Sequence, residues 1–358
     1  MARNKLINRK NKFQLIEDLK NESFKRKTCS FYRYVYIKDP QLFRDTLLKE
    51  WSKYKILGRV YIAKEGINAQ ISVPGYLWNE FILSLDSYKE FSSMHIKNAI
   101  IESNDSFIKL IVRVKNKLVA DGLNEAKYNF ENVGKHLSAK EFNSAIEDPN
   151  SIVVDMRNYY ESEVGHFENA VCPDVSTFRE ALPKVRKKLA SKKYNKILLY
   201  CTGGIRCEKA SAYLIHHGFK DVNQLNGGII EYVHQIKKNK LNSKFIGKNF
   251  VFDNRMNESI TDDIISYCHQ CDSPSSKHTD CNNKACHILF IQCKKCSKKY
   301  VGCCSVECKK IAALPIEQQR TLRKIITIAS PLKQYQKSIK PRLKDLIRER
   351  DKVKQTTH

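Results

Sequence analysis

Nine of the thirteen cysteines lie between residues 268 and 308, and this clustering constrains the fold more than any other feature of the chain. The other four, Cys29, Cys172, Cys201 and Cys207, are spread over the first 267 residues. The basic N-terminal stretch lacks the apolar middle region of a secretory signal, so we expect a cytoplasmic protein without a disulfide framework. In that compartment, cysteines serve as metal ligands or reactive thiols.

The clustered cysteines form four short pairs with the spacing of metal-binding turns. They read CHQC (268–271), CNNKAC (281–286), CKKC (293–296) and CCSVEC (303–308). Zinc binds four thiolates in a tetrahedron, and a short Cys-x2-Cys or Cys-x4-Cys turn presents two sulfurs from one knuckle. Four pairs supply eight ligands, which is enough for two zinc ions. The predicted ligands are Cys268, Cys271, Cys281, Cys286, Cys293, Cys296, Cys304 and Cys308.

The ninth cysteine of the cluster is spare, and it is either Cys303 or Cys304. We favour Cys304 as the ligand because Cys304-x3-Cys308 can begin a helix. The spacing does not say which pairs share an ion, and His269, His278 or His287 could replace a cysteine. An iron–sulfur cluster fits these spacings less well than zinc. The predicted role of the metal is structural, because the segment is too short to build a core of its own.

Residues 136–238 show an alternating α/β pattern. Ser138 and Glu141 have capping-box spacing before a short helix, and the strands SIVVDMR and KILLYC follow with helices between them. A short strand at Val222–Leu225 and an Asn-Gly-Gly turn complete the pattern. It predicts a small parallel sheet with helices on both faces, and active sites in such sheets lie at the carboxyl ends of the strands.

Cys201 stands at one of these strand ends and opens the loop CTGGIR. The backbone N–H groups of Thr202, Gly203, Gly204 and Ile205 can converge on its sulfur, and the following helix adds the partial positive charge of its N-terminus. Both effects favour thiolate over thiol, so the pattern predicts a nucleophilic cysteine rather than a buried structural one.

Four side chains near the loop are candidate partners of Cys201. Arg206 could direct its guanidinium toward an anion bound in the loop. Cys207 could act as a resolving thiol, although its helical position points it away from Cys201 and packing is an equal alternative. Asp155 and Arg157, which follow the strand SIVVD, are expected to form a structural ion pair rather than to act in catalysis.

Residues 28–120 predict a separate domain. Strands near 29–37, 58–63, 67–73, 94–101 and 108–115 alternate with helices at 40–53 and 76–88, and the order β-α-β-β-α-β is typical of a ferredoxin-like α+β fold. Tyrosines 32, 34 and 61 could stack RNA bases, although alternating aromatics more commonly pack across strands.

The chain carries a formal net charge of +26, with concentrations of basic residues at both ends. This excess favours a polyanionic partner, most plausibly nucleic acid. No run of 18 apolar residues is present, so we expect no membrane span. The predicted organisation is a basic extension at 1–27, the domains at 28–120 and 136–238, a cysteine-rich module at 250–310, and a basic tail at 311–358 that is helical or disordered. Residues 239–267 are expected to be a linker, although FVFDNR (250–255) could be ordered.

Several motifs resemble known families. CTGGIR, with DMR (155–157), YE (160–161), GHF (165–167) and LNGGI (225–229), resembles the hallmarks of rhodanese domains. EGINA (65–69), CTGGIRCEKA (201–210), FVFDNRM (250–256) and the late cysteines resemble the bacterial rhodanese-containing tRNA uridine(34) hydroxylases, the TrhO family. The resemblance covers nearly the whole chain except the first 25 residues and about the last 40.

The resemblance implies an enzyme that uses molecular oxygen to convert uridine 34 of tRNA to 5-hydroxyuridine at Cys201. It implies tRNA as partner, and no organic cofactor, membrane or obligate protein partner is evident. How Cys201 would act stays open: its thiolate could add to C6 of uracil, or it could carry a persulfide. The alternatives are a sulfurtransferase and a zinc-dependent RNA-binding protein without activity, and the intact Cys201 and Arg206 argue against the latter.

Overall fold

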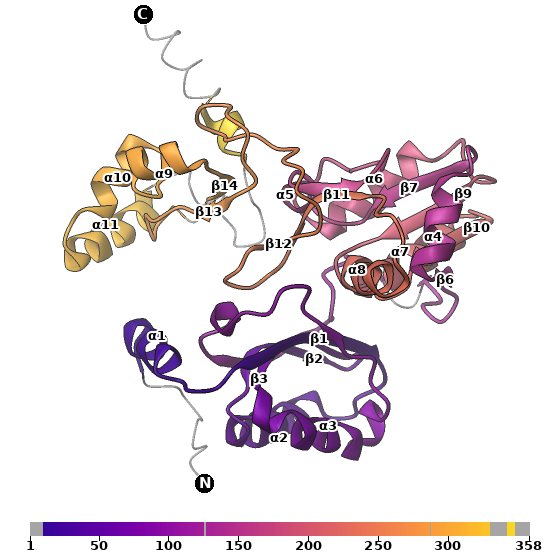
Figure 1. Cartoon of the computed structure of the whole chain (residues 1–358), viewed down its shortest axis with the longest axis horizontal. Coiled ribbons are helices and arrows are strands. Elements are labelled where there is room, and N and C mark those ends of the chain that lie inside the picture. The colour runs from indigo at the N-terminus through magenta and orange to yellow at the C-terminus, as the bar shows by residue number, and fades with distance from the viewer. Residues whose placement is uncertain (1–9, 125–126, 287, 330–341, 348–358) are drawn as a thin grey trace, which may run out of the picture. The chain divides into compact units, whose positions relative to one another are not determined.

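The structure is a computed structural model, and it describes residues 10–124, 127–286, 288–329 and 342–347 (Figure 1). The chain divides into two compact units. Unit 1 comprises residues 1–152, 191–243 and 251–258, and unit 2 comprises 153–190, 244–250 and 259–358. Unit 1 therefore joins the N-terminal domain to the chain around Cys201.

The N-terminal part of unit 1 is a five-stranded sheet with the order β4-β1-β3-β2-β5. Its strands are β1 (Arg26–Tyr34), β2 (Leu57–Ala63), β3 (Gly66–Pro74), β4 (Lys97–Asn98) and β5 (Leu110–Val114). β1 pairs antiparallel with β3 and β4, β2 pairs antiparallel with β3, and β5 runs parallel to β2. The first four strands have the order of a ferredoxin-like fold, so this prediction is confirmed, with β5 added at one edge.

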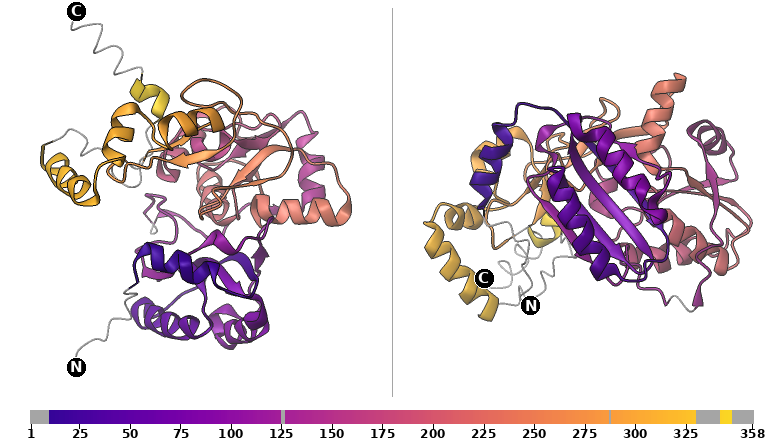
Figure 2. Two further views of the ribbon diagram at one scale, coloured as in Figure 1. Left: turned by 60° about the vertical axis from the view of Figure 1, so that its left-hand side comes forward. Right: turned by 90° about the horizontal axis from the view of Figure 1, so that it is seen from below.

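Helices α2 (Pro40–Lys53) and α3 (Trp78–Ser87) run along one face of this sheet (Figures 1 and 2). Asp39 caps α2 by accepting hydrogen bonds from the backbone N–H groups of Gln41 and Leu42. The apolar stripe of α2 buries Leu47 and Trp51 against Phe31 and Phe81, and this aromatic cluster forms the core. Short 3₁₀ turns lie at Gly75–Leu77, Lys89–Phe91 and Asn104–Ser106, and α1 (Lys12–Lys20) precedes the sheet within the expected basic extension.

The second part of unit 1 carries a parallel sheet with the order β6-β10-β9-β7. Its strands are β6 (Lys135–Leu137), β10 (Asp221–Leu225), β9 (Lys196–Tyr200) and β7 (Ser151–Asp155), whose first two residues belong to unit 1. The helices are α4 (Ala139–Ile146), α7 (Ile205–His216) and α8 (Gly228–Asn239). The expected capping box of Ser138 and Glu141 begins α4. β9 is buried from Ile197 to Tyr200, as a strand covered on both faces should be.

The segment FDNRM (252–256) is fixed to the N-terminal sheet region by Arg255. Its guanidinium pairs with Asp253 and Glu258 and donates to the carbonyl oxygen of Ile101 at 2.7 Å. Glu258, only 1% exposed, in turn accepts from the backbone N–H groups of Ile100 and Ile101 at 3.0 and 3.1 Å. The motif therefore has a structural role, because it anchors this segment of the chain to the N-terminal domain.

Unit 2 begins with α5 (Tyr159–Ser162), β8 (Gly165–Phe167) and α6 (Phe178–Lys188). β11 (Phe245–Phe250) pairs antiparallel with β8 and lies beside β12 (Asn257–Ser259). The expectation of a linker over 239–267 is thus wrong for 245–250, where Phe245 and Phe250 are buried as the inward residues of a strand. Nearby Phe167 packs edge-to-face on Phe245, which shows what drives the pairing.

The cysteine-rich part of unit 2 contains β13 (His278–Asp280), β14 (Leu289–Ile291), α9 (Lys294–Tyr300), α10 (Val306–Ala312) and α11 (Ile316–Ala329). A further helical turn at 343–347 packs Leu343, Leu346 and Ile347 into its core. Pro331 and Pro341, where the basic tail was expected to break, lie outside the described residues. Within the described ranges, no helix is both long and apolar enough to cross a membrane.

Arg255 should be a large contributor to the stability of unit 1. In Arg255→Met, two carboxylates of low exposure lose their counter-ion, and removing one partner of a buried pair costs about 3 kcal/mol. We expect the thermal unfolding midpoint to fall by several degrees in calorimetry. Arg113→Met, at an exposed position of β5, is the matched control and should leave the midpoint within about one degree. Equal midpoints for the two variants would contradict this role of Arg255.

Candidate active site at the Cys201 loop

Cys201 follows β9 directly and is fully buried at the base of a tight loop. The backbone N–H of Gly204 donates to its Sγ at 3.1 Å, and a backbone hydrogen bond from Arg206 also reaches the sulfur. Gly204 has a φ of 98° and forms the N-cap of α7. The loop therefore turns its backbone donors inward, as the sequence predicted for an anion-binding cysteine loop.

The LNGG turn supports this loop from behind. The backbone N–H groups of Ile229 and Ile230, at the start of α8, donate to the carbonyl oxygens of Cys201 and Thr202 at 3.0 and 3.2 Å. A Cβ on Gly228, where φ is 68°, would lie 2.5 Å from the Cys201 carbonyl oxygen and 2.8 Å from the amide nitrogens of the loop. Only glycine fits there, because the two turns touch backbone to backbone.

The loop holds Cys201 as a thiolate. Burial alone would raise the pKa of Cys201, but a hydrogen bond from the Cys207 thiol, the Arg206 guanidinium and the loop N–H groups outweigh it and lower the pKa to about 6. Burial and the neighbouring thiolate raise the pKa of Cys207 well above its ordinary value, so Cys207 stays a neutral donor. A thiolate close to neutral pH is the species a nucleophile requires.

Cys207 and Arg206 both lie in the first turn of α7. Cys207 was expected to point away from Cys201, yet the loop folds back far enough for the two thiols to hydrogen-bond. Arg206 Nη2 donates to Thr202 Oγ1 at 3.3 Å, so its side chain spans the loop opening. The structure thus brings Cys201, Arg206, Cys207 and the loop residues 202–205 together.

The N-terminal domain supplies another wall of the site. Tyr32 of β1 donates its hydroxyl proton to Glu208 of α7 at 2.9 Å, and a Cβ on Gly204 would lie 2.9 Å from that hydroxyl. Glu208 also contacts His136 at 3.0 Å and accepts from Gln224 at 3.0 Å. Tyr32 therefore faces the cysteine loop, with its hydroxyl group held by Glu208.

The first two residues of the EGINA motif, Glu65 and Gly66, make close contacts with other segments of unit 1. Glu65 binds the ammonium of Lys209, on α7, at 2.6 Å and accepts from the backbone N–H of Leu118 at 2.6 Å. A Cβ on Gly66, where φ is 137°, would lie 2.0 Å from the carbonyl oxygen of Arg33. Two motifs 144 residues apart, EGIN and CEKA, are therefore in direct contact.

The sequence alone did not identify Glu208, Lys209 or Lys97 as candidate residues of the site. Lys97, on the edge strand β4, is 3% exposed, and its Cε lies 3.8 Å from where a Cβ of Gly203 would be. A lysine in an edge strand gives no sequence signal of burial. Only the pairing of β1 with β4 places it beside the cysteine loop.

Asp155 and Arg157 form the expected ion pair within unit 2. Both side chains are fully buried, Arg157 donates to Asp155 from Nε and Nη2, and Nη2 also donates to the carbonyl oxygen of Gly165 at 2.6 Å. This bidentate contact holds the start of β8. Its geometry supports a structural role for the pair.

The late cysteines assemble into two groups in which all sulfurs lie within 4.8 Å of one another. One group is Cys268, Cys271, Cys293 and Cys296; the other is Cys281, Cys286, Cys304 and Cys308. The first pair thus joins the third and the second joins the fourth, an interleaving that spacing could not reveal. The closest sulfurs in the two groups are 3.6 Å apart, and a tetrahedral zinc with bonds of about 2.3 Å would separate them by about 3.8 Å. Both groups could hold a metal ion such as zinc.

The remaining candidate ligands have other partners. Cys303 lies outside both groups and directs its sulfur toward the carbonyl oxygen of Val301 at 3.8 Å. His269 contacts Glu163 at 2.8 Å, and His278 contacts the carbonyl oxygen of Tyr160 at 2.9 Å. His287 lies outside the described residues.

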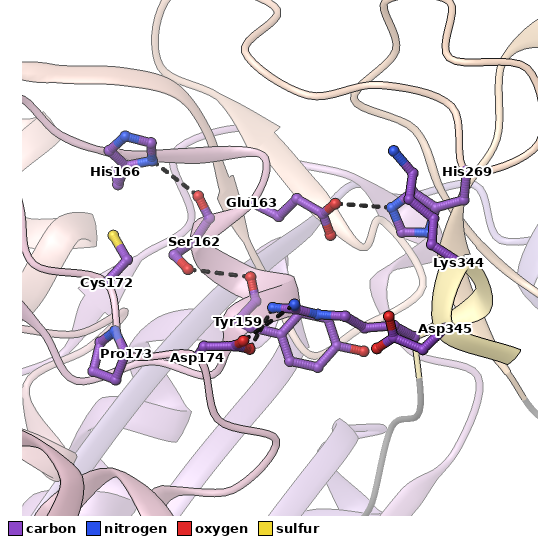
Figure 3. Close-up of a pocket in the computed structure, with 11 residues that line it drawn as sticks. Tyr159, Ser162, Glu163, His166, Cys172, Pro173, Asp174, His269, Lys344 and Asp345 are labelled. Carbon is purple, nitrogen blue, oxygen red and sulfur yellow. Dashed lines mark hydrogen bonds and ion pairs between the residues drawn. The ribbon is translucent and has the colours of Figure 1, made fainter. Parts of the chain in front are cut away.

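Unit 2 contains a separate cavity of about 410 Å³ between α5 and the C-terminal helical turn (Figure 3). Several of the charged groups in its walls are paired: Arg342 binds Asp174 at 2.5 Å and Glu163 contacts His269. Arg342 also lies 4.2 Å above the ring of Tyr159. The contacts of Arg342 help to fix the C-terminal turn.

Comparison with known proteins agrees with this architecture. Family models match residues 26–118 (UPF0176 acylphosphatase like domain), 138–235 (rhodanese-like domain) and 246–309 (Rhodanase C-terminal). A tRNA uridine(34) hydroxylase of Leptospira interrogans is 54% identical over 306 residues, which is 86% of this chain and 83% of that protein. The chain belongs to the tRNA uridine(34) hydroxylase family.

Other members of the family have similar sequence identity to this chain. Proteins of that name from Hamiltonella defensa and Pectobacterium atrosepticum are each 48% identical over 319 residues, covering 89% of this chain and 90% of theirs. Among solved structures, a rhodanese-like domain protein from Staphylococcus aureus aligns at 24% identity with a TM-score of 0.23, over 27% of this chain and 90% of that one. Membership of the family confirms the resemblance inferred from the motifs.

The acidity of Cys201 can be measured directly. We expect the absorbance of thiolate near 240 nm, taken as the difference between the unmodified protein and Cys201→Ser, to rise with a midpoint at about pH 6. The absorbance rises with pH because only the deprotonated sulfur absorbs strongly there, and the midpoint lies below that of an ordinary thiol because the neighbours of Cys201 stabilise its thiolate. Cys172→Ser, which removes a cysteine of unit 2, should keep this step. A midpoint above about pH 8 would contradict the proposed role of the loop.

Proposed function

We propose that this chain hydroxylates uridine 34 of tRNA to 5-hydroxyuridine and that Cys201 is its catalytic residue. The observation that carries the proposal is the buried thiolate at the end of β9, in a family whose members are named for this reaction. Arg206 and the N–H groups of residues 202–205 would hold the thiolate and any anion that forms there. Cys207 would donate its proton in a hydrogen bond to the resting thiolate.

The proposed chemistry begins with addition of the Cys201 thiolate to C6 of uracil. The S–C6 bond forms, and the π electrons of the C5–C6 double bond move into conjugation with the C4 carbonyl, which makes C5 electron-rich. Molecular oxygen would supply the oxygen atom that C5 receives, and its second atom would leave as water at the expense of a two-electron reductant acting as co-substrate. Loss of the C5 proton with cleavage of the S–C6 bond would then restore the C5–C6 double bond and release the Cys201 thiolate. A persulfide on Cys201 is the alternative form of the nucleophile, and the same loop could hold it.

A sulfurtransferase is the second candidate function, because a rhodanese-type loop can carry a sulfane sulfur. Hydroxylation is favoured by the names of relatives that span most of this chain and by the contact of the EGIN turn with the cysteine helix. A sulfur carrier with a small acceptor needs no second domain at its cysteine.

The proposed partner is tRNA, recognised by several basic parts of a cytoplasmic protein. The chain has 64 Lys and Arg residues against 38 Asp and Glu. In α9, Lys294, Lys295, Lys298 and Lys299 are all exposed and could contact phosphates. We assign the domain at 28–120 and the module at 250–310 to tRNA binding, the domain at 136–238 to chemistry, and no role to the ends at 1–27 and 311–358.

We further propose that the two cysteine groups each hold a structural zinc ion. Eight thiolates in two tetrahedral sets suit zinc, and helix α9 begins at one ligand, Cys293, whose sulfur accepts from the N–H of Cys296. The ions would hold β13, β14, α9 and α10 together, since this segment buries few apolar side chains besides the cysteines.

Metal content tests this assignment at two adjacent residues. We expect mass spectrometry of the purified protein to give about two zinc ions per chain, and about one for Cys304→Ser because that variant breaks one set of four. Cys303→Ser makes the same substitution one residue away and should retain about two. Loss of zinc in Cys303→Ser but not in Cys304→Ser would overturn the choice of ligand.

The activity is tested in cells by nucleoside mass spectrometry of bulk tRNA. In a strain lacking this gene and any second route to the nucleoside, 5-hydroxyuridine and its derivatives should vanish. They should return with the intact gene and stay at least about 100-fold lower with Cys201→Ser, since a hydroxyl is a poor replacement for a thiolate. Unchanged 5-hydroxyuridine together with altered thiolated nucleosides would instead support sulfur transfer.

A further inference from the structure

Lys97 is a buried cation beside the cysteine loop, and the reaction steps proposed for Cys201 do not involve it. Its side chain is 3% exposed, and its ammonium lies 4.8 Å from the ring centre of Tyr32. Its aliphatic part passes the loop, with Cδ 3.4 Å from where a Cβ of Gly227 would lie. Lys97 and Cys201 both belong to unit 1, so their proximity is a property of one compact unit.

The ammonium of Lys97 has no carboxylate partner among the described residues. Glu231 is a near acidic side chain, but it is held by His95 at 3.6 Å and by Gln235 at 3.2 Å. Glu208 is held by Tyr32, His136 and Gln224. A buried cation without a carboxylate partner is costly, and such groups persist where they have a function.

The Cys201 thiolate belongs to the loop that the side chain of Lys97 passes, with Cε of Lys97 3.8 Å from where a Cβ of Gly203 would lie. Burial lowers the pKa of Lys97 to about 8, and Cys201 is the first of the groups that oppose this shift, followed by Glu231. The lysine therefore keeps most of its charge at neutral pH while a thiolate is present. A cation and a nucleophile at one loop can bind different atoms of one small, polar, flat molecule.

We propose that Lys97 is a catalytic and specificity-determining residue whose ammonium binds the C4 carbonyl oxygen of the target uracil while Cys201 attacks C6. This proposal rests on the proposed function. When the S–C6 bond forms, the displaced electron pair is conjugated with the C4 carbonyl, and negative charge develops on O4. The ammonium of Lys97 stabilises that charge by donating a hydrogen bond to O4, and no electrons leave or enter the pair of reactants.

The same contact would select uridine over cytidine. An ammonium is a donor only, and uracil presents a carbonyl acceptor at C4. Cytosine presents an amino group there, so two donors would face each other in a buried site and neither would find an acceptor. Enzymes that modify a base bring it out of the stack into such a pocket, and the edge of the base is then read by a few hydrogen bonds.

The test uses the full-length protein and a tRNA transcript with uridine at position 34. Lys97→Met removes the charge at similar length, Lys97→Arg keeps it, and Lys109→Met alters an exposed lysine of the same domain as control. Single-turnover formation of 5-hydroxyuridine and the Kd for tRNA are measured separately. We expect Lys97→Met to lower the rate about 100-fold or more with Kd changed less than about threefold, as for loss of one electrostatic contact to the reacting group.

Two results would overturn the proposal. One is a Lys97→Met rate within about threefold of the unmodified protein; the other is a loss explained entirely by weaker tRNA binding, which would make Lys97 a phosphate contact. The thiolate titration of Cys201 serves as a readout that needs no hydroxylation. Lys97→Met should move its midpoint to higher pH, Lys97→Arg should move it less, and an unchanged midpoint would contradict the placement of the charge. If the unmodified protein makes no 5-hydroxyuridine, the proposed function fails, whatever Lys97 does.

Discussion

The ion pair between Glu65 and Lys209 holds the cysteine helix against the turn between two strands of the N-terminal sheet. Lys209 is 2% exposed, and its ammonium also lies 3.7 Å from the ring centre of Phe130 and 4.9 Å from that of Tyr34. A buried pair of this kind contributes little net stability, but neither partner can be lost without leaving an uncompensated charge. The pair therefore specifies how α7 meets the first domain more than it stabilises either.

The geometry of the cysteine loop follows from that contact. Only three residues separate Cys201 from α7, so fixing the helix also fixes the loop and the side chains of β1 and β4 that face it. Tyr32 then reaches Glu208, and Lys97 is buried beside the glycines of the loop. A rhodanese loop alone supplies the thiolate; the ferredoxin-like domain adds an aromatic wall and a cation. This combination explains how one thiol chemistry can be directed to a nucleobase.

Much of this arrangement could be read from the sequence, and the limit is physical. The strand order of the first domain, the cysteine loop and the eight-cysteine set follow from local pattern and spacing, which act over a few residues. Features that depend on residues far apart in the sequence left no such signal. They are the pairing of Glu65 with Lys209, the burial of Lys97 and the way the four cysteine pairs combine into two groups. The expectation that Cys207 points away from Cys201 was wrong. It was based on the geometry of an ideal helix and did not include how far the preceding loop folds back.

A double-mutant cycle on Glu65 and Lys209 tests directly whether the contact between the two domains builds the site. Purified Glu65→Gln, Lys209→Met and the double variant would be compared with the unmodified protein by kcat/KM for 5-hydroxyuridine formation. We expect each single change to lower kcat/KM and the double variant to lose about as much as one single variant, because each change removes the same interaction. Losses that multiply, or single variants with full activity, would contradict it.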